Sequence, residues 1–145
     1  MTKTSKQDVF ERACVDGDLL TAARFLNDHD FKLSKTTLKY VLKKAVLDNN
    51  IELVKMLLTD DRVDPSYDDN ILLTIAANYG HIEIIKLLLA DDRVDPAKHA
   101  SKITWMATMN GKIDALKLLM SDDRVKCKLT ADELAEYRKL IEENS

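Results

Sequence analysis

The tetrapeptide Asp-Asp-Arg-Val occurs three times in this chain, beginning at Asp60, Asp91 and Asp122. Both steps between copies are 31 residues long (91−60 and 122−91). A short word repeated at constant spacing indicates stacked copies of one small supersecondary element, since a single copy cannot bury its apolar face alone. Chains of this kind usually act through an extended surface, so the repeat argues against a single catalytic pocket.

An apolar segment with a central lysine precedes each copy of the word, at Ile51–Leu58, Ile82–Leu89 and Ile113–Met120. A degenerate fourth version, Leu19–Leu26, lies nearer the N-terminus. The apolar residues recur at helical spacing, so each segment predicts an amphipathic helix.

Glycine and proline keep the same register as the repeated word. The position just before the apolar segment is occupied in successive copies by Gly17, Asn49, Gly80 and Gly111. Glycine and asparagine best tolerate the left-handed conformation that ends a helix, so this position predicts a turn between two antiparallel helices. Both prolines, Pro65 and Pro96, share one position in the loop that follows.

Composition narrows the class of protein. The 145 residues are 46 % hydrophobic, enough for the core of one domain, and the net charge of −3 disfavours a general nucleic-acid binder. The longest apolar runs are interrupted by lysines, and the first residues lack the apolar core of a signal peptide. Two distant cysteines, Cys14 and Cys127, suggest a reducing compartment. We therefore expect a cytoplasmic monomer that binds neither nucleic acid nor membranes.

The predicted organisation is one domain, residues 1–145, with copies at about 8–37, 38–69, 70–100 and 101–128. A last helix is expected over residues 130–143. It begins with Thr130-Ala-Asp-Glu133, in which the threonine and glutamate side chains can satisfy free main-chain amides as a capping box. Its apolar side would seal the end of the stack.

The segment Ala76 to Leu89, Ala-Ala-Asn-Tyr-Gly-His-Ile-Glu-Ile-Ile-Lys-Leu-Leu-Leu, resembles the helical half of an ankyrin repeat. The resemblance covers roughly residues 8 to 128. It implies an all-α solenoid of about four stacked helix-turn-helix repeats with a C-terminal capping helix, acting as a non-catalytic protein-binding module. The period of 31 is shorter than the family's usual ~33. The Thr-Pro-Leu-His start is absent, and Asp-Asp-Arg-Val-Asp-Pro replaces the family's loop, a variant similar to ankyrin arrays of protists and their large DNA viruses.

The acidic loops invite a calcium-site interpretation, which the sequence does not support. A calcium loop needs ligands at alternating positions around a glycine, and these loops have none. The preferred interpretation is structural. The aspartates accept loop amides, while Arg62, Arg93 and Arg124, which recur at the repeat spacing, form a ladder of ion pairs between copies.

No catalytic constellation can be assembled from the sequence. The three histidines, His29, His81 and His99, occupy three different loop positions, and the dispersed glycines cannot form a phosphate loop. We therefore expect no enzyme activity, no metal and no cofactor.

By the resemblance, recognition residues lie at the loop tips and on the inner helices, which form a concave face. The loop tips supply Tyr67, Asp68, Asn70, Lys98, His99 and Ser101. The inner helices supply Asn78, Tyr79, Met109 and Asn110, with Trp105 at the family's histidine position. Tyr67 and Tyr79, set among polar residues, favour a binding role. For Trp105 the general tendency of large aromatics favours packing between copies over partner binding.

A basic run, Lys35, Lys39 and Lys43, recurs at four-residue spacing, with Lys32 and Lys44 adjacent. The ordinary interpretation is a solvated helix face; a functional one would favour an acidic partner segment. The sequence as a whole predicts a module that holds a partner protein of unknown identity. The alternative is a structural or self-associating spacer without a dedicated partner.

Overall fold

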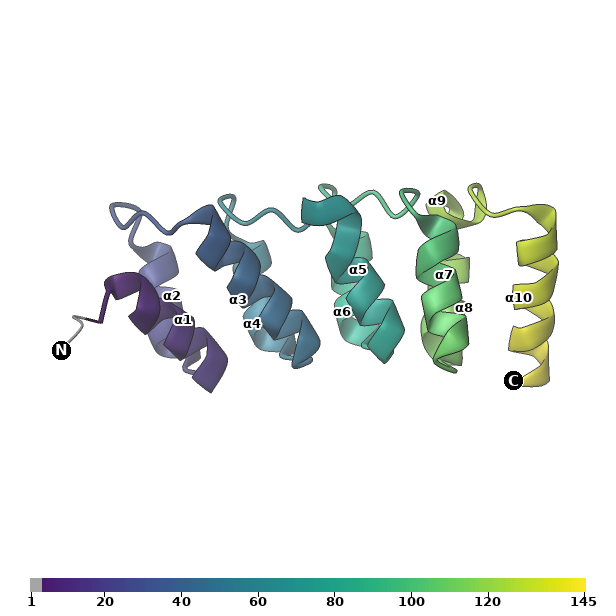
Figure 1. Cartoon of the computed structure of the whole chain (residues 1–145), viewed down its shortest axis with the longest axis horizontal. Coiled ribbons are helices and arrows are strands. Elements are labelled where there is room, and N and C mark those ends of the chain that lie inside the picture. Colours follow the sequence, from purple (N-terminus) through teal and green to yellow (C-terminus); the bar gives the residue numbers. More distant parts are fainter. Residues whose placement is uncertain (1–3) are drawn as a thin grey trace. The chain divides into compact units, whose positions relative to one another are not determined.

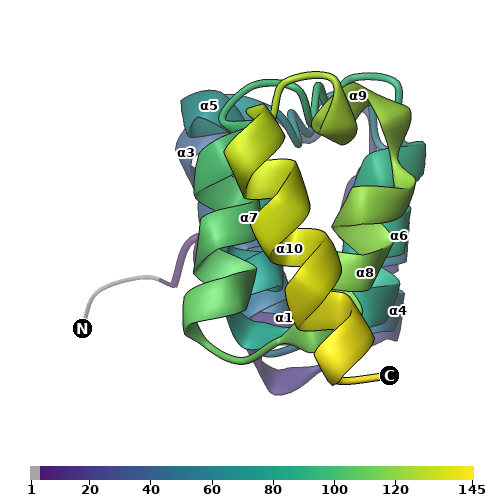
Figure 2. The same cartoon turned by 90° about the vertical axis from the view of Figure 1, so that its right-hand side faces the viewer.

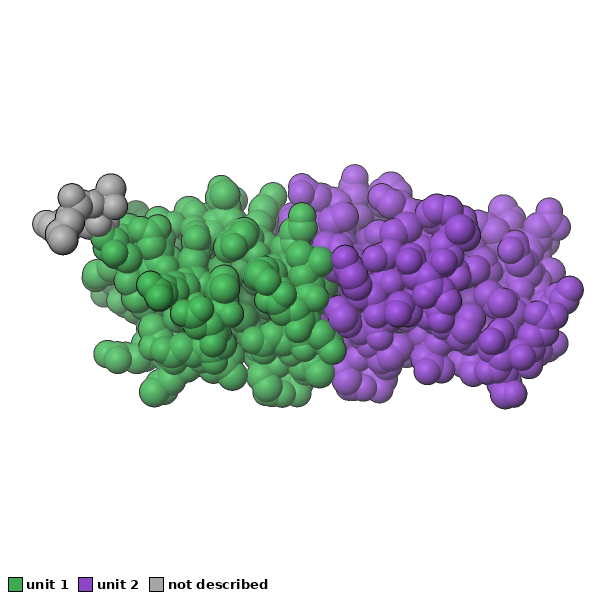
Figure 3. All heavy atoms as spheres, turned by 60° about the horizontal axis from the view of Figure 1, so that its bottom comes forward, with its two compact units in different colours: residues 1–64 green, residues 65–145 purple. Residues whose placement is uncertain are grey.

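The computed structural model describes residues 4–145, and within that range all regular structure is helical (Figure 1). The chain divides into two compact units, Met1–Asp64 and Pro65–Ser145 (Figure 3). Unit 1 contains α1 (Lys6–Asp16), α2 (Leu19–Asn27), α3 (Lys35–Leu47) and α4 (Ile51–Leu58). Unit 2 contains α5 (Tyr67–Tyr79), α6 (Ile82–Ala90), α7 (Ala100–Met109), α8 (Ile113–Ser121), the single turn α9 (Asp123–Lys126) and α10 (Ala131–Glu143).

Within each unit the helices form pairs that stack on one another. In unit 1, α1 packs on α2 and α3 on α4, while α1 also contacts α3 and α2 contacts α4. In unit 2, the pairs α5–α6 and α7–α8 pack in the same way, with α5 against α7 and α6 against α8. We call α1, α3, α5 and α7 the first helices and α2, α4, α6 and α8 the second helices. Within each unit the predicted all-α stack of helix-turn-helix pairs is confirmed.

The turn inside each pair adopts the predicted left-handed conformation. The φ angles there are 77° at Gly17, 54° at Asn49, 73° at Gly80 and 63° at Gly111. Gly80 meets a second constraint, because a Cβ atom at this position would lie 2.9 Å from Cδ of Lys112. A side chain there would therefore need both a strained main chain and a displaced lysine.

Large apolar side chains fill the core of each unit. In unit 1 the fully buried ones are Phe10, Leu42, Leu53 and Leu57. In unit 2 they are Leu72, Leu73, Ile84, Ile85, Leu88, Ile103, Leu116 and Leu119. Burying each such side chain contributes roughly 1.5–3 kcal/mol, so packing between helices, rather than any helix alone, holds the copies together.

The repeated arginines make contacts that differ from the ion-pair ladder expected between copies. The guanidinium groups of Arg62 and Arg124 pair with the first aspartate of their own loop, at 2.6 Å to Asp60 and 2.7 Å to Asp122. The aspartate in turn accepts the main-chain amide of its arginine, as predicted, at 2.9 Å in both loops. Each aspartate therefore holds its arginine in place.

The same two arginines link neighbouring copies through main-chain carbonyl groups. Arg62 donates to the carbonyl of Leu26 at 2.7 Å and to that of Phe31 at 3.2 Å, both in unit 1. Arg124 donates to the carbonyl of Leu89 at 2.7 Å in unit 2. The last carbonyls of a helix lack intrahelical partners, which makes them good acceptors for a long cationic side chain. The hydrogen-bond acceptor in the preceding copy is thus a carbonyl group and not the carboxylate that the ladder prediction requires. Carboxylates of the preceding copy, Asp28 near Arg62 and Asp92 and Asp95 near Arg124, attract these arginines only at longer range.

Helix α10 seals the end of the α7–α8 pair (Figure 2). The predicted capping box is present, with the Thr130 amide 2.7 Å from the Glu133 carboxylate and the Glu133 amide 3.2 Å from the Thr130 hydroxyl. Tyr137 of α10 is buried, and Thr104 of α7 is fully buried. The helix covers a surface that a further copy would otherwise cover.

Candidate partner-binding surface

The exposed large hydrophobic side chains are concentrated on the first helices. Among residues 4–145 these side chains are Val9 and Val15 on α1, Tyr40 and Leu47 on α3, Tyr79 on α5, and Trp105 and Met109 on α7, with Leu20 on α2 as the exception. The second helices instead carry paired charges on their exposed surface, such as Lys55 with Glu52 at 3.0 Å and Lys86 with Glu83 at 2.7 Å. The first helices thus present apolar area that the fold does not use.

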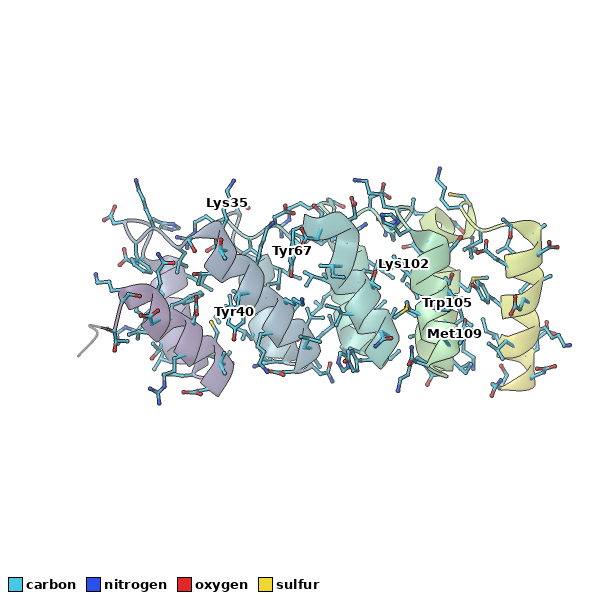
Figure 4. All side chains as sticks on the ribbon, in the orientation of Figure 1. Lys35, Tyr40, Tyr67, Lys102, Trp105 and Met109 are labelled. Carbon is cyan, nitrogen blue, oxygen red and sulfur yellow. The ribbon has the colours of Figure 1, made fainter. Side chains whose placement is uncertain are left out.

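Helix α7 carries the most prominent part of this surface. Lys102, Trp105 and Met109 follow one another along the helix (Figure 4). Their spacing of three and four residues places them on one face. Trp105 is 52 % exposed and Met109 is 63 % exposed. The sequence favoured packing between copies for Trp105. About half of this side chain is exposed, so the interpretation is wrong for the exposed half.

Tyr79 lies at the end of α5, in the same unit as Trp105, and is 52 % exposed. Its ring stacks on that of His81, with 5.6 Å between centroids and an interplanar angle of 12°. Nearby, the side-chain amide of Asn110 donates to the side-chain oxygen of Asn78 at 2.8 Å, which ties the ends of α7 and α5 together. These contacts hold the tyrosine and both asparagines in defined positions at the surface.

Three of the predicted loop-tip residues are exposed: Asp68, Lys98 and His99. They gather around Asp69, whose carboxylate lies 3.9 Å from the Lys98 ammonium and 3.8 Å from Nε2 of His99. Such exposed pairs contribute little to stability, so the side chains stay available to a partner. The fold therefore brings two predicted loops together at one edge of unit 2.

Tyr67 and Asn70 are buried, at 7 % and 2 % exposure, so the expectation that they project from a loop tip is wrong. The chain makes an unusual turn here, because Asp68, Asp69 and Asn70 all have positive φ angles of 47°, 53° and 62°. This left-handed turn directs Asn70 inward, where its amide donates to the Asp95 carbonyl at 2.6 Å. Burial raises the pKa of the Tyr67 hydroxyl to about 12.

Ser101, predicted at a loop tip, lies in the first turn of α7 and is only partly exposed. The hydrogen bond from the main-chain amide of Thr130 and, to a smaller degree, the nearby Ser101 hydroxyl lower the pKa of the Glu133 carboxylate of α10. Ser101 therefore lies beside the capping helix.

The sequence interpretation did not name several exposed residues of the first helices, among them Tyr40, Leu47 and Lys102. The repeat register contained a signal for Leu47, because it precedes Asn78 by 31 residues, and Asn78 precedes Met109 by 31 (78−47 and 109−78). Residues that lie one repeat length before or after a predicted contact residue were thus further candidates for the partner-binding surface.

Chemically reactive groups are sparse in the part of the chain that the structure describes. No three histidine, cysteine or carboxylate side chains there come together in a way that could hold a metal ion. Cys14 is buried, and burial raises the pKa of its thiol to about 12, whereas Cys127 is exposed. None of the described helices is both long and apolar enough to cross a membrane.

Comparison with known protein families identifies the family of the repeats. The family model for ankyrin repeats (three copies) matches residues 10–100 and again residues 42–133. The two matches together span all four predicted copies and the start of α10. No curated protein and no solved structure shows significant similarity to the sequence.

Proposed function

Since this chain belongs to the ankyrin repeat family, whose repeats are generally protein–protein interaction modules, we propose that it binds a partner protein through its first helices and loop tips. The family is typically non-catalytic, and the proposal includes no chemical step. The observation that carries it is the concentration of exposed apolar side chains on α1, α3, α5 and α7.

The chemistry of the surface in unit 2 suits this role. Trp105 and Tyr79 offer large apolar area with few rotatable bonds, and such residues dominate the energetics of protein interfaces. Met109 adds a flexible apolar side chain that adapts to different partner shapes. The exposed polar residues Asp68, Lys98 and His99 supply the rim at the loop edge.

A set of alanine substitutions with a matched control tests this proposal. The variant Tyr79→Ala/Trp105→Ala/Met109→Ala removes the exposed large apolar side chains of unit 2, while Leu20→Ala removes the still more exposed apolar side chain of a second helix. Each protein is immobilised and the proteins that it retains from a cell extract are identified by mass spectrometry. Proteins retained by the wild type and by Leu20→Ala, but not by the triple variant, are the expected result.

Two measurements complete the test. Circular dichroism and thermal unfolding check that the triple variant is folded. We expect it to fold like the wild type, because all three side chains are at least half exposed. An unchanged set of retained proteins in the folded triple variant would rule out this surface. A chain whose mass by light scattering grows with concentration, and which retains no other protein, would instead be a self-associating spacer.

A further inference from the structure

Two asparagine side chains at the ends of α5 and α7, here called the amide pair, are hydrogen-bonded to each other on the surface of unit 2. Nδ2 of Asn110 donates to Oδ1 of Asn78 at 2.8 Å and to the main-chain carbonyl of Met106 at 2.9 Å. Both hydrogens of the Asn110 amide are therefore used. Because the Met106 carbonyl can only accept, this contact also fixes which end of the Asn110 amide is nitrogen and which is oxygen.

The amide pair presents one further donor and one further acceptor. Within residues 4–145, no other residue forms a hydrogen bond with Nδ2 of Asn78 or with Oδ1 of Asn110. Asn110 is exposed and Asn78 is partly exposed, so a partner can reach both side chains. Their positions are already held by the bonds within the pair, so little side-chain entropy is lost when these two groups bind.

The repeated fold does not require two asparagines here. One repeat before Asn78 the chain has Leu47, and two repeats before Asn110 it has Asp48 (78−47 and 110−48). Helix α3 ends at Leu47 with Asp48 as its C-cap, without an amide at either position. The amide pair therefore belongs to the residues that differ between copies, and such residues give a repeat array its recognition surface.

A donor and an acceptor held together match the main chain of an extended peptide. In a β-strand the N–H and C=O groups of one residue point to the same side, and both can bond to one neighbour. An α-helix uses these groups for its own hydrogen bonds, so the side of a helix cannot offer them. The amide pair is thus suited to an extended segment and not to a helix.

Exposed apolar side chains adjoin the amide pair on both helices. Tyr79 follows Asn78 at the end of α5, and Met109 precedes Asn110 at the end of α7. Trp105 lies about one turn before Met109 on the same face of α7 (Figure 4). Successive side chains of an extended segment point to opposite sides, so neighbouring residues of one segment can contact α5 and α7.

We propose that the amide pair holds the main chain of an extended segment of a partner protein. This inference rests on the proposed function and specifies the conformation of the partner at this surface. Nδ2 of Asn78 donates to a carbonyl group of the segment, and Oδ1 of Asn110 accepts the amide hydrogen of the same residue. Apolar side chains on the two sides of the segment contact Tyr79 on α5 and Trp105 on α7.

Peptides displayed on phage test the inference with the full-length chain. The library holds random sequences of about ten residues, which are too short for a stable isolated helix. We expect the chain to retain peptides that are rich in apolar residues. One of them is synthesised with a fluorescent label, and its affinity is measured by anisotropy.

Replacing each peptide bond of this peptide in turn by an ester tests the main-chain contact. An ester removes one N–H donor without adding bulk. One replacement should weaken binding to the wild type by about three- to tenfold, and the others should have little effect. The same replacement should have no further effect on binding to Asn110→Ala, because the acceptor for that N–H is then absent.

A substitution in the chain tests the donor of the amide pair. Asn78→Asp keeps the oxygen that accepts from Asn110 and replaces the donor by an acceptor. The peptide should bind about tenfold or more weakly, because its carbonyl group then faces a carboxylate. The matched control is Asn27→Asp, which makes the same change at an exposed position at the end of α2 and should leave the affinity unchanged.

Three outcomes would overturn the inference: no retained peptide, tolerance of every ester replacement, or equal effects of Asn78→Asp and Asn27→Asp. The proposed function has a separate readout. Peptides that Trp105→Ala releases, but that tolerate every ester replacement, would show binding through side chains alone. The proposed function would then stand without this inference.

Discussion

The Nη2 atom of Arg124 donates a hydrogen bond of 2.7 Å to the main-chain carbonyl of Leu89, 35 residues earlier in the chain. Leu89 lies in the last turn of α6, where carbonyl groups have no partner within the helix. The Asp122 carboxylate accepts two hydrogen bonds from the same guanidinium group, from Nη2 at 2.7 Å and from Nε at 3.1 Å. Asp122 and Arg124 thus form a clasp between a loop and the end of a helix in the preceding copy.

Removing this clasp should lower stability. Arg124→Met keeps an unbranched apolar chain but loses the bonds to Asp122 and Leu89. We expect the free energy of unfolding to fall by about 1 kcal/mol, a modest value because the Arg124 side chain is 45 % exposed. Arg138→Met, which removes the same charge from an exposed site on α10, should change stability by less than about 0.5 kcal/mol. Urea denaturation measures both, and equal effects would contradict the clasp.

The aspartates of the clasp should make stability depend on acid. Hydrogen bonds from the arginine side chains hold the pKa of Asp60, Asp91 and Asp122 below the ordinary value of 3.8. A group whose pKa is lowered on folding stabilises the protein above its unfolded pKa, and that contribution disappears as pH falls through the folded pKa. The variant Asp60→Asn/Asp91→Asn/Asp122→Asn should therefore be less stable than the wild type near neutral pH.

The difference between this variant and the wild type should shrink as the solution is acidified below about pH 5. Urea denaturation at a series of pH values, followed by circular dichroism, gives the two curves. A difference that stays constant from neutral to acidic pH would show that the aspartates do not act through their charge.

The left-handed turn at the start of α5 predicts opposite effects for two substitutions at one residue. Asp68 has a φ of 47° and an exposed side chain, so the main chain decides the outcome. Asp68→Val should destabilise the protein by about 1–2 kcal/mol, because a β-branched residue tolerates this conformation poorly. Asp68→Gly should be neutral or slightly stabilising. Thermal unfolding compares the two variants, and similar melting temperatures would contradict the left-handed conformation.

Deleting residues 129–145 should destabilise the chain and promote self-association. The deletion removes the buried Tyr137 and uncovers the side of α8 that α10 contacts. Loss of one large buried aromatic alone costs about 3–5 kcal/mol. Deleting only residues 144–145, beyond the end of α10, is the control and should have little effect. A shortened chain that remained monomeric by light scattering and equally stable would show that α10 is not a cap.

The two cysteines should react at very different rates. Burial, and the nearby charge of Glu11, raise the pKa of Cys14 to about 12, while Cys127 is exposed. A thiol reagent near neutral pH should therefore modify one cysteine of the folded chain quickly and the second only after denaturation. Cys127→Ser should abolish the fast reaction. Two rapidly reacting thiols in the folded wild type would contradict the burial of Cys14.

The sequence predicted the features that local chemistry determines. The left-handed positions at Gly17, Asn49, Gly80 and Gly111 follow from residues that tolerate positive φ, and the cap at Thr130 and Glu133 follows from a short-range pattern of side chains. The helix-turn-helix copies follow from apolar spacing. Each of these features depends on residues only a few positions apart.

The features that the sequence interpretation missed depend on contacts between distant residues or on a rare main-chain conformation. The Arg124 side chain donates to a carbonyl group 35 residues earlier in the chain. The tetrapeptide Asp-Asp-Arg-Val alone does not indicate which group accepts this hydrogen bond. The burial of Tyr67 and Asn70 accompanies three successive positive φ angles without a glycine to announce them. For Trp105 the average behaviour of tryptophan favours packing over partner binding, whereas the position of this residue on α7 leaves about half of its side chain exposed to solvent.

The clasp also has a consequence for how such an array lengthens or shortens. Arg62 and Arg124 both donate to a main-chain carbonyl group of the preceding copy. A 31-residue segment that is duplicated in the gene therefore carries its own arginine for the contact with the copy before it. The new junction requires no matching change elsewhere, because a helix end offers its carbonyl groups whatever its side chains are. Gain or loss of a whole segment should therefore disturb the stability of the remaining copies little. The exposed residues of the first helices can then change independently of these contacts.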